Sequence, residues 1–161
     1  MEISHPVRVR RTYVQTLVAP PEKVFPLLCP VRETEWASGW NPRQVITQSG
    51  YVEPGCIFVV PNVPQDSIWI VTQWDSKEFF VEFINVTPGI TVGKIEIQLH
   101  QGEKEQTLAE VSYSYTALSQ KGSEFVEQFT PGQYQVWMQE WESELNHFLQ
   151  TGTKKENQTP H

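Results

Sequence analysis

Regularly spaced turn signals between Gln44 and Ala117 constrain the fold of this chain more than any other feature. Between them lie short runs rich in β-branched and aromatic residues, which favour extended strands. The turn signals are Ser49-Gly50, Pro54-Gly55, Pro61 to Gln65, Asp75-Ser76, Pro88-Gly89 and Gln101-Gly102. Short runs separated by turns at this spacing predict antiparallel strands joined in sequence order, which is a meander.

Two runs within the meander alternate between apolar and polar residues, at 94–99 and at 110–115. This period of two predicts strands with one face packed in the core and the other exposed to solvent. The runs at 68–74 and 79–86 are apolar on both faces. The sequence therefore leaves open which face of these two strands points inward.

One strand and two short helices are expected before the meander. The β-rich run at 12–18 predicts the first strand, which ends at a Pro-Pro pair. Residues 22–28 carry apolar side chains at helical spacing, and two prolines limit that helix to about two turns. A second short helix is expected at 32–37.

The C-terminal third predicts a long helix over 130–149, preceded by a helical turn or two at 123–129. Thr130 and Gln133 match a capping box, in which a hydroxyl and an amide satisfy free backbone N–H groups. An apolar stripe at spacings of three, four and seven then follows: Tyr134, Trp137, Met138, Trp141, Leu145 and Phe148. Its first member and Phe129 flank the cap as a hydrophobic staple. We assign the last three members to the core.

Length and composition bound the class of protein. The 161 residues predict a single domain at 12–150, with an N-terminal arm at 1–11 and a polar, disordered tail at 151–161. The net charge of −7 argues against nucleic-acid partners. No run reaches the ~20 apolar residues of a membrane span and no secretory core is present, so we expect a cytoplasmic protein without integral membrane contact. Cys29 and Cys56 are expected to be buried thiols. The oligomeric state stays open.

Several stretches of the chain are similar to a known family. They are Leu17 to Phe25, Cys29 to Glu33, Glu35-Trp36, Gly39-Trp40, Trp69 to Thr72, Trp74-Asp75, Val86 to Gly89, Tyr113 to Leu118 and Trp141 to Leu145. With the order of elements, they resemble the START-like superfamily, also called SRPBCC or birch-pollen-allergen-like, in its bacterial polyketide cyclase/dehydrase and lipid-transport branch. The resemblance implies an α+β helix-grip fold, with a curved antiparallel sheet of about seven strands wrapped around a long C-terminal helix.

The resemblance also implies a cavity between the sheet and the long helix. Aromatic residues are the candidates for its wall, since ligand pockets are mostly apolar with a few placed polar groups. The candidate ligand-binding residues are Trp36, Trp40, Phe58, Trp69, Phe83, Tyr113, Tyr115, Phe129, Tyr134 and Trp137. The alternative for each is that it fills the core. That alternative is least favoured for Trp36 and Trp40, because a Gly-flanked loop at the mouth of the sheet has less reason to be core.

Motifs for nucleophilic, phosphate-binding and metal chemistry are missing from the sequence, so we expect no metal and no other cofactor. The catalytic candidates are Glu82 and Tyr113. A cavity-facing Glu82 would have a raised pKa suited to acid–base chemistry, whereas an outward-facing one would be an ordinary solvated carboxylate. Arg32 and Glu33 are expected to form an ion pair at the surface or the cavity rim.

Three functions fit these features. The first is binding or transport of a small hydrophobic molecule, either lipid-like or aromatic and polyketide-like, in the internal cavity. The second is an enzyme of the polyketide cyclase/aromatase or dehydratase type that needs no metal or nucleotide. The third is a protein-interaction or chaperone-cofactor module, which would require an exposed apolar patch. The scaffold alone does not choose among them, because fold does not fix function.

Overall fold

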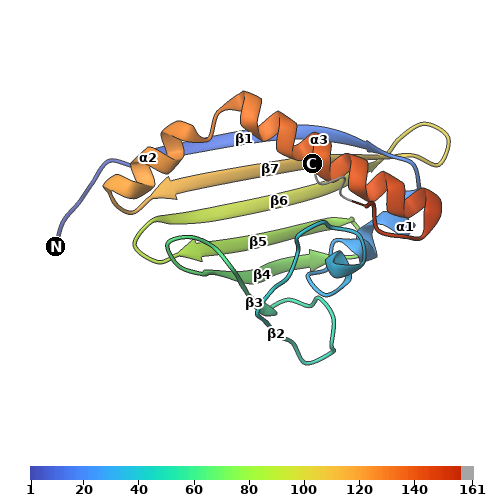
Figure 1. The fold of residues 1–161 in the computed structure, drawn as a ribbon, viewed down its shortest axis with the longest axis horizontal. Coiled ribbons are helices and arrows are strands. Elements are labelled where there is room, and N and C mark those ends of the chain that lie inside the picture. Colours follow the sequence, from blue (N-terminus) through green and yellow to red (C-terminus); the bar gives the residue numbers. More distant parts are fainter. Residues whose placement is uncertain (157–161) are drawn as a thin grey trace.

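Seven antiparallel strands form one curved sheet that wraps around a long helix in the computed structural model, which describes residues 1–156 (Figure 1). The strands are β1 (Arg8–Leu17), β2 (Gln44–Ile46), β3 (Ile57–Val60), β4 (Ser67–Asp75), β5 (Phe80–Thr87), β6 (Thr91–Gln101) and β7 (Thr107–Ala117). Their order in the sheet is β1-β7-β6-β5-β4-β3-β2. The meander expected from the turn signals is therefore confirmed, and β1 joins it beside β7.

Within residues 1–156, three α-helices and two short 3₁₀ helices complete the fold. They are α1 (Pro21–Val24), η1 (Phe25–Leu27), η2 (Arg32–Glu35), α2 (Gln120–Gln128) and α3 (Pro131–Thr151). The first expected short helix is thus split into α1 and η1, because Pro26 removes a backbone donor that a continuing α-helix needs. The helix-grip architecture implied by the family resemblance is confirmed. Residues 157–161 of the expected tail lie outside the described residues.

The first strand begins at Arg8, four residues before the expected start. Pairing with β7 extends from Leu17 back to Arg8, opposite Thr116, and a strand can lengthen by backbone hydrogen bonds without apolar side chains. The Arg8 side chain donates to Thr116 Oγ1 at 2.8 Å on the outer face, and Arg11 donates to the Phe129 carbonyl oxygen at 3.0 Å. The sequence prediction missed this extension because it followed hydrophobicity alone.

Helix α3 crosses the concave face and is fastened to the β1 side of the sheet. Gln15 of β1 donates to the Met138 carbonyl oxygen at 3.1 Å, and Asn146 bonds the backbone of Thr16 and Val18 at 3.0 Å. The Thr130 hydroxyl accepts the Gln133 backbone N–H as the capping motif predicts. These bonds hold α3 over β1 and β7, so the opposite half of the concave face is covered by other elements.

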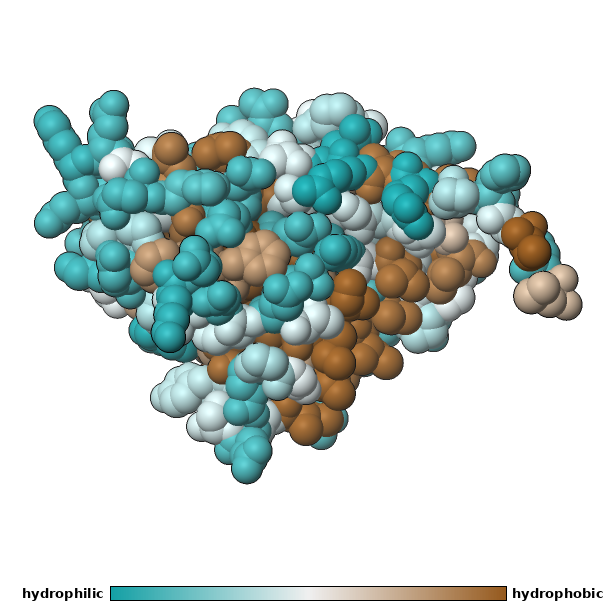
Figure 2. Space-filling model, turned by 180° about the vertical axis from the view of Figure 1, so that it is seen from behind, coloured by the Kyte–Doolittle hydropathy of each residue, from teal (hydrophilic) through white to brown (hydrophobic). Residues whose placement is uncertain are grey.

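The two doubly apolar strands have a defined inward face. On β5, Phe83 and Asn85 are buried on the concave side, so Glu82 and Ile84 point outward. On β4, Trp69 and Val71 point inward. Their outward neighbours join an aliphatic patch on the convex face, visible in Figure 2. The patch consists of Ile46, Ile57, Val59, Ile68, Ile70, Ile84, Val86 and Val92.

Both cysteines are buried and unpaired, as expected. Cys29 accepts the backbone N–H of Val52 at 3.2 Å, and burial raises the pKa of the Cys56 thiol. Among the described residues, no helix has the length and apolar character needed to cross a membrane.

Candidate functional site

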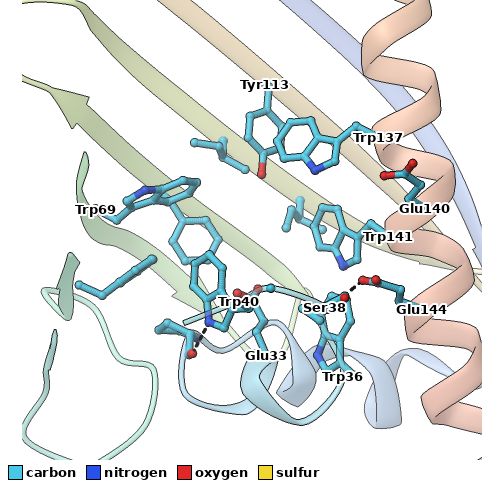
Figure 3. A pocket seen from close by; sticks show the side chains of 17 residues that line it. Glu33, Trp36, Ser38, Trp40, Trp69, Tyr113, Trp137, Glu140, Trp141 and Glu144 are labelled. Atoms are coloured by element: carbon cyan, nitrogen blue, oxygen red, sulfur yellow. Dashed lines mark hydrogen bonds between the residues drawn. The ribbon is translucent and has the colours of Figure 1, made fainter. Parts of the chain in front are cut away.

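A cavity of about 250 Å³ lies between the concave face of the sheet and α3 (Figure 3). Its polar lining includes three carboxyl side chains, Glu33, Glu140 and Glu144. Its aromatic lining is Trp36, Trp40, Phe58, Trp69, Phe83, Tyr113, Trp137 and Trp141. Seven of the ten aromatic residues that the sequence suggested for a binding site therefore meet around one cavity, and Trp141 joins them.

The loop after η2 carries two of these tryptophans and holds each by its indole nitrogen. Trp36 Nε1 donates to the Leu27 carbonyl oxygen at 3.0 Å, and Trp40 Nε1 donates to the Pro30 carbonyl oxygen at 2.7 Å. Between them, Gly39 adopts a φ of 72°, a left-handed conformation that favours glycine. Because the N–H groups are bonded to the backbone, the ring faces are left as the surfaces of the wall.

Two aromatic walls face each other across the cavity (Figure 3). On the sheet side, Phe58 stacks on Trp69 with ring centroids 5.4 Å apart, and Phe83 meets both rings edge-on. On the helix side, Trp137 packs edge-on against Tyr113 at 4.7 Å. These mutual contacts fix the rings, so the walls are preformed.

Trp141 packs against the core, as the sequence predicts, but it also lines the cavity. Because α3 lies over β1 and β7, only Tyr134, Met138 and Leu145 of the stripe are fully buried. Trp141 lies on the adjoining flank, stacks parallel to Trp36 at 5.9 Å and lines the cavity. Its Nε1 is buried and has no hydrogen-bond partner. A buried N–H without a partner costs about 1–3 kcal/mol, which an acceptor on a ligand would recover.

Glu33 corrects the sequence interpretation, because it does not pair with Arg32. Arg32 instead bonds Glu35 at 2.9 Å. In a 3₁₀ helix residues three apart lie on the same side, so positions 32 and 35 face solvent together while position 33 turns away. The Glu33 side chain points into the cavity (Figure 3), and desolvation there raises its pKa to about 8. A large part of the Glu33 population is therefore protonated near neutral pH.

Tyr113, one of the two catalytic candidates, lines the cavity and points its hydroxyl into it (Figure 3). Burial raises its pKa well above the usual value, so the hydroxyl remains a hydrogen-bond donor. Glu82, the other candidate, lies on the outer face of β5. There it accepts the Thr72 hydroxyl at 2.9 Å and pairs with Lys94 at 3.5 Å. Glu82 therefore faces outward and is paired with Lys94, and it does not line the cavity.

Three of the ten candidates, Tyr115, Phe129 and Tyr134, do not line the cavity. Tyr115 and Phe129 pack with Phe125 at the other end of the concave face, where Tyr115 lies 4.8 Å from Phe125 and 5.1 Å from Phe129. Tyr134 lies between the two groups, with its ring 5.6 Å from Phe129 and 6.0 Å from Tyr113. Tyr134 also donates from its hydroxyl to the Val111 carbonyl oxygen at 2.5 Å. For these three residues the core alternative is correct.

Within residues 1–156, no three His, Cys, Asp or Glu side chains converge closely enough to hold an ion. The cavity offers aromatic contact, the unpaired Trp141 indole N–H, the Tyr113 hydroxyl and carboxyl groups.

No family model and no curated protein matches this chain in sequence, but solved structures do. Norcoclaurine synthase from Thalictrum flavum matches with a TM-score of 0.67 at 12% identity, over 91% of this chain and 88% of that one. Ara h 8.0201 matches with a TM-score of 0.59 at 12% identity, over 89% of this chain and 99% of that one. The di-domain ARO/CYC BexL from the BE-7585A biosynthetic pathway matches with a TM-score of 0.63 at 12% identity, over 88% of this chain and 46% of that one. The chain thus shares the helix-grip fold of these proteins.

Proposed function

We propose that the protein binds a small aromatic molecule in the cavity between α3 and the sheet. The observation that carries the proposal is a cavity of about 250 Å³ walled by preformed aromatic rings, with the buried Trp141 Nε1 lacking a partner beside it. Flat rings placed between these walls would gain apolar burial and edge or face contacts. An acceptor atom on the ligand would satisfy the indole N–H.

The size of the cavity favours an aromatic ligand over a lipid-like one. An apolar cavity of about 150 Å³ is known to hold one benzene molecule, so about 250 Å³ suits one or two fused rings. A long acyl chain or a folded polyketide chain needs a pocket in the upper part of the usual ~300–1,000 Å³ range. The proposal is therefore binding of a compact aromatic molecule rather than of a lipid.

Calorimetric titration with 2-naphthol, naphthalene and palmitate tests this proposal. We expect 2-naphthol to bind more tightly than naphthalene, because its oxygen can accept from Trp141, and palmitate not to bind. Trp137→Ala should weaken the binding of 2-naphthol about tenfold, because Trp137 forms part of the wall of the cavity. The residue is 40% exposed. Phe125→Ala is the matched control, because Phe125 is 38% exposed on α2 but does not line the cavity. Tight palmitate binding, or none by any probe, would refute the proposal.

A second candidate function, acid–base catalysis, is favoured by one specific observation. Glu33, with a pKa of about 8, and the Tyr113 hydroxyl both face the cavity (Figure 3). A carboxyl with a pKa near the working pH is suited to moving a proton, and a tyrosine hydroxyl can stabilise an enolate oxygen. The reaction supported best is enolisation of a small aromatic ketone, in which Glu33 carboxylate removes the proton next to the carbonyl.

Deuterium exchange into 2-tetralone, followed by NMR, tests this second candidate. The wild-type protein should accelerate exchange next to the carbonyl, and Glu33→Gln should lower the rate by about 10²-fold or more. Tyr113→Phe should lower it while 2-tetralone still binds. Exchange no faster than in buffer would remove catalysis and leave binding as the function.

A further inference from the structure

The charges around the cavity are all of one sign. Carboxyl groups of Glu33, Glu140 and Glu144 line it, and within the described chain its lining contains no Lys, Arg or His. The cations nearest in the chain are engaged elsewhere, since Arg32 bonds Glu35 and the Lys155 ammonium donates to Ser143 at 2.7 Å. The lining itself therefore offers carboxyl groups without a cation, while Lys155 lies outside it, in an adjoining hollow that Glu140 and Glu144 also line.

The three carboxyl groups hold different positions. Glu144 accepts the Ser38 backbone N–H at 3.1 Å, which ties the tryptophan loop to α3 beside the cavity. Glu140 is exposed on α3 at the rim. Glu33 reaches between the aromatic walls, and its backbone N–H bonds the Cys29 carbonyl oxygen at 2.8 Å, so η2 holds it there. Of the three, Glu33 is placed to touch a bound molecule.

Aromatic faces add a second attraction for positive charge. The electron-rich face of an indole attracts ammonium groups, most strongly where water is excluded. Trp40 and Trp141 present rings on the two sides of Glu33 (Figure 3). A neutral ring would be satisfied by the walls alone, but only a cation uses both the rings and the carboxyl.

Building on the ligand-binding role above, we propose that the ligand is a small aromatic amine whose ammonium group binds between Glu33 and the adjoining indole faces. The ring of the ligand then occupies the space between the sheet wall and Trp137. Glu140 at the rim attracts the cation as it approaches. The same carboxyl groups disfavour a carboxylate ligand.

Proton release accompanies such binding. Glu33 is largely protonated at pH 7 because burial raises its pKa to about 8, and an ammonium group favours its ionised form. The other titratable groups facing it are Tyr113 from β7 and Glu140 and Glu144 from α3. Tyr113 stays protonated, so the proton released on binding comes from Glu33. Affinity for an amine should therefore increase as the pH rises toward 8.

Three probes with one ring and different charge test the inference by calorimetric titration: 2-phenylethylamine, 2-phenylethanol and 3-phenylpropionate. We expect the amine to bind about tenfold more tightly than the alcohol, and the carboxylate most weakly. Titration at pH 7 in two buffers of different ionisation enthalpy should show proton release with the amine and none with the alcohol. Alcohol binding as tight as that of the amine overturns the inference while the proposed function stands, and no binding by any probe overturns both.

Glu33→Gln isolates the charge from the shape of the site. We expect the amine affinity to fall more than the alcohol affinity, so that the preference for the amine drops to about threefold or less, and we expect proton release to vanish. Glu35→Gln is the matched control on the same 3₁₀ helix, because Glu35 bonds Arg32 and does not line the cavity. An amine preference that survives Glu33→Gln overturns the assignment of Glu33. The two-buffer titration of the wild-type protein needs no variant and decides the question independently.

Discussion

The two ends of the concave face are both rich in aromatic side chains but differ in what covers them. At the closed end, Tyr115, Phe125, Phe129 and Tyr134 fill the space beneath α2 and the start of α3. At the cavity end, the rings stand apart around about 250 Å³. Aromatic content therefore does not decide whether a region of this sheet becomes core or binding site.

The segment that covers each end decides whether that end becomes core or binding site. Over the closed end lies α2, which packs so tightly against the sheet that only a glycine fits at position 122. Over the cavity end lies the loop after η2, whose indole groups are bonded to the backbone of Leu27 and Pro30. A loop held by its own backbone does not need to collapse onto the sheet, so the cavity persists.

Gly122→Ala should have the largest effect, and it should be confined to the closed end. A Cβ atom at this position would lie 1.9 Å from the Ile90 carbonyl oxygen and 3.1 Å from Ala117 Cα, so α2 must move away from the sheet. We expect the free energy of unfolding to fall by about 3 kcal/mol, measured by chemical denaturation. Folded protein should keep its affinity for 2-naphthol, because the cavity lies at the other end.

Gly132→Ala is the matched control for this change. Gly132 lies in the first turn of α3, and a Cβ there would meet no heavy atom within 4 Å. We expect this variant to gain up to about 1 kcal/mol, since alanine favours helix over glycine. Equal stability of both variants would contradict the tight packing of α2. A loss of 2-naphthol affinity in Gly122→Ala would show instead that the two ends are coupled.

Glu33→Gln should have the next largest effect on stability, and that effect should depend on pH. The pKa of Glu33 is raised from 4.5 to about 8 on folding, so its protonated form is favoured in the folded state. The associated stability is complete below about pH 4.5 and is lost as the pH rises through 8. Because glutamine does not ionise, the variant should match wild type near pH 4 and exceed it by about 2 kcal/mol near pH 9.

Denaturation curves across this pH range measure the difference, with Glu35→Gln as the control. Glu35 lies on the solvent side of the same 3₁₀ helix, so its substitution should give a difference that does not grow with pH. A constant offset between Glu33→Gln and wild type would mean that the carboxyl is solvated. The cavity end would then be an open, wet cleft rather than a desolvated site.

Much of the fold could be predicted from the sequence, because it rests on local signals. Turn residues separated the strands of the meander, and the Thr130 cap marked the start of α3. The start of β1 was misplaced because Arg8 to Arg11 pair through the backbone, which hydrophobicity does not report. Local patterns therefore gave the elements more reliably than their ends.

The candidate site was predicted less completely, since it depends on how elements lie across one another. The stripe on α3 is continuous in sequence, but bonds such as Gln15 to Met138 tilt the helix toward β1 and leave Trp141 over the cavity. Glu33 was missed because Arg32 beside it suggested an ion pair. The signal that could have found it is the spacing of three between Arg32 and Glu35, which places Glu33 on the other side of a 3₁₀ turn.

The smallest expected effect compares two stacked tryptophans within the cavity end. Trp36 and Trp141 lie parallel at 5.9 Å, but only Trp36 has a hydrogen-bond partner for its indole N–H, the Leu27 carbonyl oxygen. Both phenylalanine substitutions remove similar ring area, whereas only Trp36→Phe leaves a buried carbonyl oxygen without its donor. Trp36→Phe should therefore be less stable than Trp141→Phe by about 1 kcal/mol in chemical denaturation. In 2-naphthol titrations the order should reverse, with Trp141→Phe losing more affinity, because its N–H is the one left for a ligand. Equal stability and equal affinity in the two variants would mean that the Trp36 N–H does not stabilise the fold and that the Trp141 N–H does not bind the ligand.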